Sequence, residues 1–199
     1  PMKNSGSNGT ISGTSCRPSI SWWKTAACMP SCTAINLGRV NMPKKIMFVC
    51  HGNICRSPMA EFIFMDITKK NGVADRFIVS SSATSTEEIW RGVGNPVYPP
   101  AQRELMKHGI SCEGKRAVQL TKDDYNNFDY FIGMDRANIR NMNIILGGDP
   151  DVKIYKMMSF AGLGDDVADP WYSGDFTKTY NDILSGCIGL LDFLKDKLE

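Results

Sequence analysis

From residue 44 onwards, short apolar runs alternate with segments whose apolar residues recur every three or four positions. The short runs predict strands at Lys45–Val49, Phe77–Ser80, Tyr130–Gly133 and Val152–Tyr155. The longer segments predict helices at Pro58–Asn71, Pro99–His108, Lys122–Asn127, Ala137–Ile145 and Phe176–Leu198. Such alternation is typical of a parallel sheet with helices on both faces. We therefore expect a three-layer α/β/α domain around a central parallel sheet of about four strands.

The chain divides near Met42. Residues 1–42 are rich in Ser, Thr, Gly and Asn and show no sustained period of 2 or 3.6. We interpret them as a poorly ordered leader that comes from a tag or vector or forms an unusual extension. Trp22 and Trp23, with Cys16, Cys28 and Cys32, keep open a docking, disulfide or metal-binding role. Residues 43–199 are interpreted as one domain.

The charge balance of the domain argues against nucleic-acid binding. Residues 1–42 hold four Lys or Arg and no Asp or Glu, so residues 43–199 hold 19 basic and 21 acidic side chains, a net charge of −2. Such a domain is not built to grip a phosphate backbone. No apolar run approaches the roughly 20 residues that span a bilayer.

The cysteine and histidine counts restrict the compartment and the chemistry. Seven cysteines, an odd and unevenly spread number, do not form the pattern of a secreted disulfide framework. We therefore expect a reducing cytoplasm. With only His51 and His108, a histidine-based metal site is not expected.

The segment Cys50–Ser57 joins the first predicted strand to the first predicted helix. A loop in this place can surround a tetrahedral oxyanion with backbone N–H groups, the Arg56 guanidinium and a positive helix end. The same field stabilises Cys50 as an attacking thiolate. The residues expected to form this loop are His51, Gly52, Asn53, Ile54, Cys55 and Ser57. A thiolate in a phosphate cradle favours phosphoryl transfer through a cysteinyl intermediate.

The loop resembles the Cys-x4-Cys-Arg-Ser/Thr signature of the low-molecular-weight protein tyrosine phosphatases. Further segments resemble this family in order and spacing: Gly94–Pro96, Lys107–Ile110, Gly133–Asn138 and Asp169–Tyr172. The resemblance covers Pro43 to the C-terminus. It implies hydrolysis of phosphotyrosine in a protein, or of a small aryl phosphate, through a cysteinyl phosphate.

Several expectations about ligands accompany this resemblance. No cofactor or metal is expected, because the loop supplies the positive field that Mg²⁺ provides elsewhere. Inorganic phosphate or vanadate should inhibit by occupying the loop. We expect a monomer or weak dimer in the cytoplasm, with no nucleic-acid or membrane partner.

The resemblance also assigns roles outside the loop. It selects Asp169 as general acid and base, with Asp165 and Asp166 as rivals in the same Gly/Asp-rich segment. It implies that a serine and a histidine brace Asn53, and Ser81 and His108 are the matching residues. From the residues alone, His108 is a helix-end residue that complements the dipole.

Ser57 and three aromatic residues have two readings each. Ser57 can donate a hydrogen bond to the Cys50 sulfur, and it also suits a helix N-cap. Trp171 and Tyr172 are expected to form one wall of an aromatic slot and Trp90 the other, with core packing as the competing role. Relative to the shortest pattern of the family, residues 90–93 form an insertion before Gly94–Pro96. We expect this insertion to affect the rim of the pocket and the substrate preference.

Cys55 lies five residues after Cys50 in the same loop. An exposed thiolate is readily oxidised to a sulfenic acid, and a nearby thiol can trap it as a reversible disulfide. We expect this redox role for Cys55, with simple packing as the alternative.

Two other functions compete with phosphatase activity. An arsenate reductase of the same fold would need a further redox pair, and beyond Cys55 only Cys112 and Cys187 remain, 75 positions apart. A non-catalytic phosphotyrosine-binding module is expected to lack the nucleophile or the acid. Cys50, Arg56 and Asp169 are all present, so phosphatase activity is preferred.

Overall fold

The computed structural model describes residues 42–195 and residue 197. These residues belong to one compact unit, Arg39–Glu199. The predicted leader, with its two tryptophans and three cysteines, lies outside the described residues except for Met42.

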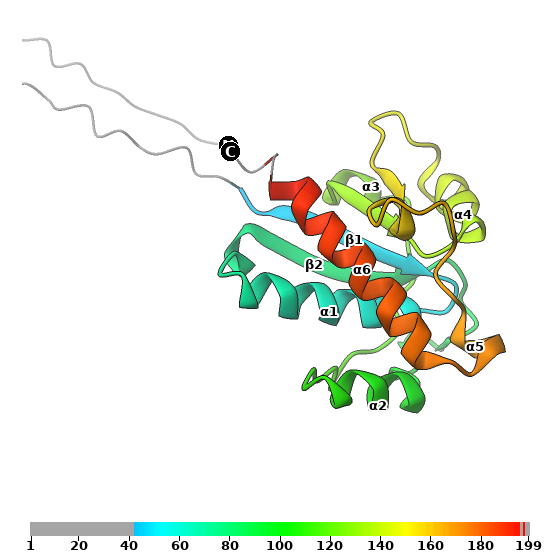
Figure 1. The fold of residues 1–199 in the computed structure, drawn as a ribbon. Helices are drawn as coiled ribbons and strands as arrows, with labels where there is room; N and C mark the ends of the chain where they lie inside the picture. Colours follow the sequence, from blue (N-terminus) through cyan, green and yellow to red (C-terminus); the bar gives the residue numbers. More distant parts are fainter. Residues whose placement is uncertain (1–41, 196, 198–199) are drawn as a thin grey trace, which may run out of the picture. The chain divides into compact units, whose positions relative to one another are not determined.

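A parallel sheet of four strands forms the centre of the domain (Figure 1). Its order is β2 (Phe77–Ala83), β1 (Lys44–Cys50), β5 (Tyr130–Gly133) and β6 (Ile154–Lys156). The predicted parallel sheet of about four strands is thus confirmed. The predicted start of the last strand at Val152 is wrong, because Val152 has φ 54° and the Asp149 carboxylate accepts the N–H groups of Lys153 and Ile154.

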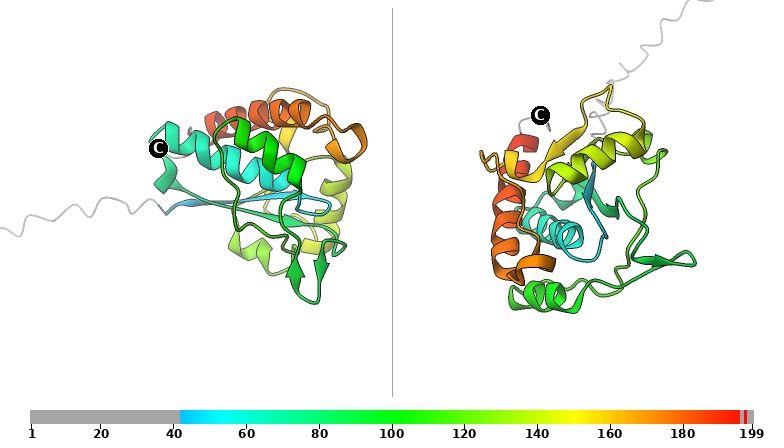
Figure 2. Two further views of the ribbon diagram at one scale, coloured as in Figure 1. Left: turned by 90° about the horizontal axis from the view of Figure 1, so that it is seen from below. Right: turned by 90° about the vertical axis from the view of Figure 1, so that its right-hand side faces the viewer.

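Helices cover both faces of the sheet. The first layer holds α1 (Arg56–Lys70), α2 (Pro99–Lys107) and α6 (Phe176–Lys195), which lie together above the sheet in the left view of Figure 2. The second layer holds α4 (Arg136–Leu146), which packs against β5 and β6, and α3 (Asp124–Asn127). Two 3₁₀ turns, Ala74–Arg76 and Met157–Ser159, precede β2 and follow β6.

Three short elements were not predicted. Strands β3 (Ile89–Trp90) and β4 (Val93–Gly94) form an antiparallel hairpin that projects away from the sheet (Figure 2), and α5 (Pro170–Ser173) precedes α6. Each contains only two to four residues, which is too short to show a strand or helix period. Within residues 42–195, no helix is both long and apolar enough to cross a membrane.

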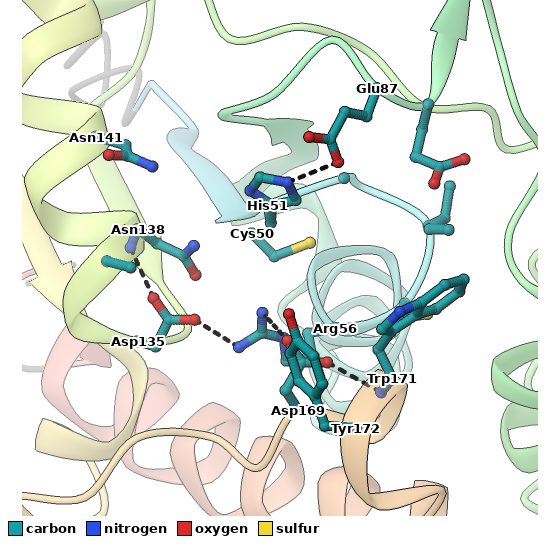
Figure 3. Close-up of a pocket in the computed structure, with 15 residues that line it drawn as sticks. Cys50, His51, Arg56, Glu87, Asp135, Asn138, Asn141, Asp169, Trp171 and Tyr172 are labelled. Carbon is teal, nitrogen blue, oxygen red and sulfur yellow. Dashed lines mark hydrogen bonds and ion pairs between the residues drawn. The ribbon is translucent and has the colours of Figure 1, made fainter.

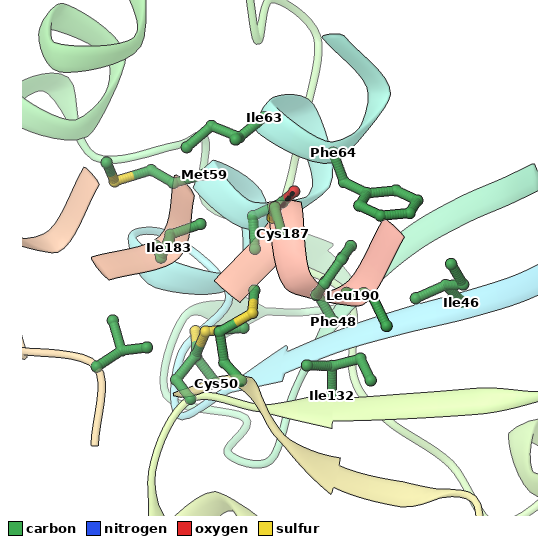
Figure 4. Close-up of a cluster of buried hydrophobic side chains, with 14 of the residues drawn as sticks. Ile46, Phe48, Cys50, Met59, Ile63, Phe64, Ile132, Ile183, Cys187 and Leu190 are labelled. Atoms are coloured by element: carbon green, nitrogen blue, oxygen red, sulfur yellow. Dashed lines mark hydrogen bonds between the residues drawn. The ribbon is translucent and has the colours of Figure 1, made fainter. Parts of the chain in front are cut away.

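The alternation of side chains along β1 builds two cores. Ile46, Phe48 and Cys50 point to the face covered by α1 and α6, whereas Met47 and Val49 point to the face covered by α4. Figure 4 shows Cys50 at one end of the first cluster, with Ile46 at the other. The nucleophile predicted from the sequence therefore continues a buried row of the central strand.

Helix α6 approaches the chain after β6 closely enough to require glycine. Cys187, predicted as a core residue, is fully buried in this helix. A Cβ atom added at Gly189 would lie 2.0 Å from the backbone oxygen of Phe160. Backbone cannot move aside as a flexible side chain does, so an alanine at residue 189 would force α6 and the Phe160 segment apart.

We predict that Gly189→Ala lowers the free energy of unfolding by about 2 kcal/mol, although alanine normally favours a helix interior. Urea titration followed by circular dichroism measures the change. The control is Ser185→Ala on the exposed face of α6, which should stay within about 0.5 kcal/mol of wild type. Equal midpoints for Gly189→Ala and the control would contradict the close packing.

Candidate active site

The loop after β1 forms the floor of a cavity of about 400 Å³. It lies at the carboxyl end of the sheet, where ligands bind in open α/β folds. Figure 3 shows how Cys50, Arg56 and Asp169 converge there from β1, α1 and the segment before α5. The structure therefore brings the three predicted catalytic residues to one site, with Cys50 and Arg56 almost completely buried.

The carbonyl groups of the loop are held from outside the cavity. Four of these carbonyl oxygens accept a hydrogen bond from a backbone N–H group. The Cys50 oxygen accepts from Thr84 (2.9 Å) and the His51 oxygen from Ser85 (2.9 Å). The Ile54 oxygen accepts from Tyr98 (2.8 Å) and the Cys55 oxygen from Met59 (3.1 Å). In a trans peptide the C=O and the following N–H point in opposite directions. The N–H groups that follow these carbonyls consequently turn inward, as an oxyanion requires.

Two donors lie at the Cys50 sulfur. Ser57 Oγ is 3.0 Å from Cys50 Sγ, and the Asn53 N–H donates to Sγ at 3.3 Å. Both groups therefore contact the sulfur from within the loop and the first turn of α1. The additional role expected for Ser57 as helix N-cap is wrong, because α1 begins at Arg56 and Ser57 lies inside its first turn.

Asn53 is the brace of the loop. Its backbone is left-handed, with φ 55°, a conformation that asparagine tolerates better than most residues. Its Nδ2 donates to Ser57 Oγ and Ser81 Oγ, each at 2.8 Å, and its Oδ1 accepts from the Val118 N–H at 3.0 Å. The structure thus places Ser81 beside Asn53, as the family resemblance implies.

The predicted contact between His108 and Asn53 is wrong. His108 follows α2, where its ring stacks on Tyr180 at a centroid distance of 3.8 Å, in agreement with the helix-end reading. Glu61 and Lys115 support the Asn53 network in place of the predicted histidine. Ser81 Oγ donates to Glu61 Oε2 at 2.5 Å, and Lys115 Nζ lies 2.6 Å from the same oxygen. The brace ends in a mostly buried ion pair.

Arg56 is held between two carboxylates. Its Nη1 lies 2.7 Å from Asp135 Oδ2 and its Nη2 lies 2.6 Å from Asp169 Oδ2. Burial alone would lower the pKa of Arg56, but the negative charges of Cys50 and Asp169 and the hydrogen bond to Asp135 raise it. The guanidinium therefore stays charged in the cavity.

Asp135 is a site residue that the sequence analysis missed. It follows β5 at the same sheet edge as Cys50 and caps α4, where its Oδ1 accepts the Asn138 N–H at 2.7 Å. An aspartate between a buried strand and a predicted helix is a detectable cap signal. Asp135 fixes Arg56 through its other oxygen.

Asp169 is the N-cap of α5, where its Oδ1 accepts the Trp171 N–H at 3.0 Å. The side chain is 30% exposed, so it is reachable from the cavity. The rival Asp166 pairs instead with Lys156 at 3.0 Å, and neither Asp165 nor Asp166 is among the residues that line the cavity.

The predicted aromatic slot is only half present. Trp171 and Tyr172 of α5 line the cavity, as expected. Both readings of Trp90 are wrong, because its side chain is 75% exposed on the β3–β4 hairpin and does not line the cavity. The hairpin turns through Arg91 and Gly92, both at positive φ, and thereby carries Trp90 away from the site.

Cys55 lines the cavity but is mostly buried. Burial, together with the negative charge of Cys50, raises the pKa of the Cys55 thiol to about 12. Cys55 is therefore a neutral thiol at physiological pH.

We predict that Lys115→Met costs about 2–3 kcal/mol of unfolding free energy, because it leaves Glu61 buried without its partner. It should also lower kcat, since Glu61 anchors Ser81 and, through it, Asn53. Urea titration and steady-state kinetics measure the two effects. The matched control is Lys195→Met, whose partner Asp192 is exposed and whose loss should cost under about 0.5 kcal/mol. Equal effects of the two variants would contradict the anchoring role.

Comparison with known proteins agrees with this geometry. The family model for low molecular weight phosphotyrosine protein phosphatase matches residues 45–199. The low molecular weight protein-tyrosine-phosphatase YfkJ of Bacillus subtilis is 37% identical over 148 residues, which cover 73% of this chain and 92% of YfkJ. PtpA of Staphylococcus aureus is 34% identical over 152 residues, covering 75% and 92%.

Solved structures give the same result. The crystal structure of YfkJ matches with a TM-score of 0.74 and 35% identity, over 80% of this chain and 99% of that one. The low molecular weight phosphatase SP-PTP of Streptococcus pyogenes matches with a TM-score of 0.65 and 40% identity, over 77% and 92%. The extent of these matches and the architecture of the Cys50 loop show that the chain belongs to the low-molecular-weight protein tyrosine phosphatase family.

Proposed function

We propose that this phosphatase hydrolyses phosphotyrosine with Cys50 as nucleophile, Arg56 as phosphate-binding residue and Asp169 as general acid and base. The observation that carries the proposal is the placement of the Cys50 sulfur at the base of a loop whose N–H groups turn inward, beside a charged guanidinium. Such a site stabilises the charge of the transferring phosphoryl group.

In the first step the Cys50 thiolate attacks phosphorus and the bond from phosphorus to the phenolic oxygen breaks. Asp169 gives its proton to that oxygen, so the leaving group departs as neutral tyrosine. Arg56 and the loop N–H groups bind the equatorial oxygens. The products are a cysteinyl phosphate and an Asp169 carboxylate.

In the second step a water oxygen attacks phosphorus and the sulfur–phosphorus bond breaks. Asp169 accepts a proton from the water, which restores the acid. The electron pair returns to the Cys50 sulfur as thiolate, where Ser57 and the Asn53 N–H stabilise it. Inorganic phosphate is released.

Asp169 must leave Arg56 to act. Its Oδ2 lies 2.6 Å from Arg56 Nη2, so in this arrangement it contacts the guanidinium and not a leaving group. Substrate phosphate can replace Asp169 at Nη2, while Asp135 keeps Nη1 in place. Arg56 thus stays oriented as its second partner changes.

The depth of the nucleophile supports an aryl substrate. Cys50 is only 3% exposed, so the phosphate must be carried inward on a long, flat group. Trp171 and Tyr172 at the rim offer aromatic faces to such a ring. Phosphoserine is too short to reach the sulfur without bringing its backbone into the cavity.

Further proposals concern the setting of the enzyme. Inorganic phosphate and vanadate inhibit by occupying the loop, and the enzyme acts as a monomer or weak dimer. A reducing cytoplasm is supported by the four described cysteines, all of them free. We propose that residues 43–199 form the catalytic domain and residues 1–42 a separate leader.

The two competing functions gain no support. Cys112 and Cys187 are both buried, and burial raises the pKa of each thiol, which does not suit a redox relay for arsenate reduction. A non-catalytic phosphotyrosine-binding module would not require a general acid. The position of Asp169 beside Arg56 therefore favours catalysis over binding alone.

The first test is hydrolysis of p-nitrophenyl phosphate and a phosphotyrosine peptide at about pH 6, with EDTA present. Cys50→Ser should have no activity and Asp169→Ala should lose about 10²–10⁴-fold in kcat. Arg56→Lys should lose activity with both substrates, because lysine lacks the planar fork. Unchanged kcat in Asp169→Ala would overturn its assignment, and a phosphoserine peptide is the substrate control.

Cys55 is proposed as the thiol that traps oxidised Cys50. Oxidation of Cys50 to a sulfenic acid removes the negative charge that helps to hold the pKa of Cys55 at about 12. The Cys55 sulfur then attacks the sulfenic sulfur. The sulfur–sulfur bond forms, the sulfur–oxygen bond of the sulfenic acid breaks, and the departing hydroxide takes the Cys55 thiol proton and leaves as water.

After peroxide treatment, wild type should recover most activity with thiol, and Cys55→Ser should recover little because over-oxidation is irreversible. The control is Cys112→Ser, outside the lining of the cavity. Equal recovery of the Cys55→Ser and wild-type enzymes would eliminate the protective role.

A further inference from the structure

One side of the active-site cavity is acidic. Glu87 and Glu88, in the segment between β2 and β3, line the cavity together with Trp171 and Tyr172 of α5. In Figure 3, Glu87 lies above Cys50 on the side away from Arg56 and Tyr172. The cavity therefore has a carboxylate rim facing an aromatic one.

Glu88 is built into the loop. A Cβ atom added at Gly52 would lie 2.9 Å from Glu88 Cγ, so the stem of Glu88 occupies the space that a side chain at residue 52 would need. Asn95 Nδ2 donates to Glu88 Oε2 at 2.7 Å and fixes the carboxylate from the hairpin side. This contact positions Glu88 at the edge of the cavity.

Glu87 is more accessible. Its side chain is 71% exposed, and its Oε2 lies 3.0 Å from Nε2 of His51, which is itself 54% exposed. Within residues 42–195, neither Glu87 nor Glu88 forms an ion pair with a lysine or arginine. Both side chains therefore line the cavity without a lysine or arginine partner among the described residues.

This rim opposes the charge of the phosphate. Arg56 is the one lysine or arginine among the lining residues that the structure describes, and Asp135 and Asp169 already pair with it. Two further carboxylates disfavour an isolated phosphate dianion. They favour a ligand that carries a positive charge a short distance from its phosphate.

We propose that Glu87 and Glu88 form a subsite for a lysine or arginine side chain next to the phosphotyrosine of the substrate protein. This subsite rests on the proposed function, because the phosphotyrosine in the loop sets the position of the neighbouring residue. The acidic rim selects among phosphoproteins by charge and leaves the chemical step to Cys50 and Asp169.

The test compares kcat/KM for phosphotyrosine peptides that differ only in the residues on either side of phosphotyrosine, which are lysine, alanine or glutamate. Wild type should prefer the lysine peptide to the glutamate peptide by about tenfold at low ionic strength and by less at high ionic strength. The Glu87→Gln/Glu88→Gln double variant should bring this ratio close to one. Glu87→Lys/Glu88→Lys should invert it.

The matched control is Glu113→Gln, which removes one exposed carboxylate outside the cavity lining and should keep the wild-type ratio. Because each ratio is measured within one protein, loss of stability in a variant does not imitate the effect. A wild-type ratio near one, or a ratio preserved in the double variant, overturns the subsite alone. Failure to hydrolyse any phosphotyrosine peptide, with p-nitrophenyl phosphate still hydrolysed, overturns the protein substrate as well.

Discussion

The buried guanidinium of Arg56 is the interaction on which the site depends. It comes from the first turn of α1 and joins Asp135, which follows β5, to Asp169, which caps α5. Three segments far apart in the sequence are thus fixed around one charge. Leaving that charge without partners in a buried place would cost several kcal/mol, so the fold and the site stabilise each other.

The loop itself is shaped by groups outside it. Four of its carbonyls accept hydrogen bonds from neighbouring segments, and Asn53 connects it to Ser81 and Val118. Beyond Ser81 lie Glu61 and Lys115, which end the network in an ion pair. The inward N–H groups are therefore preorganised before any anion enters, which is how such loops lower the cost of binding charge.

The sequence was sufficient for the sheet and the loop because their signals are local. A buried strand, a cysteine and an arginine in one short segment predict the position of Cys50 without any distant contact. The residues that support Asn53 could not be predicted in this way. Glu61 and Lys115 are 54 positions apart and meet only in the folded chain, so no periodicity marks them. The family resemblance instead implies His108 as a partner of Asn53. Trp90 was misplaced for a related reason, because two-residue strands leave no pattern that would reveal the hairpin.

The alternation along β1 has a consequence for how the family can vary. Cys50 is the next member of the row formed by Ile46 and Phe48, and the residues between them serve the opposite core. Adding or deleting one residue in this strand would exchange the two rows and turn the nucleophile toward α4. The direction of the Cys50 side chain therefore depends on the number of residues in β1. The segment between β2 and β3 and the β3–β4 hairpin can change in length without turning the nucleophile away from the site.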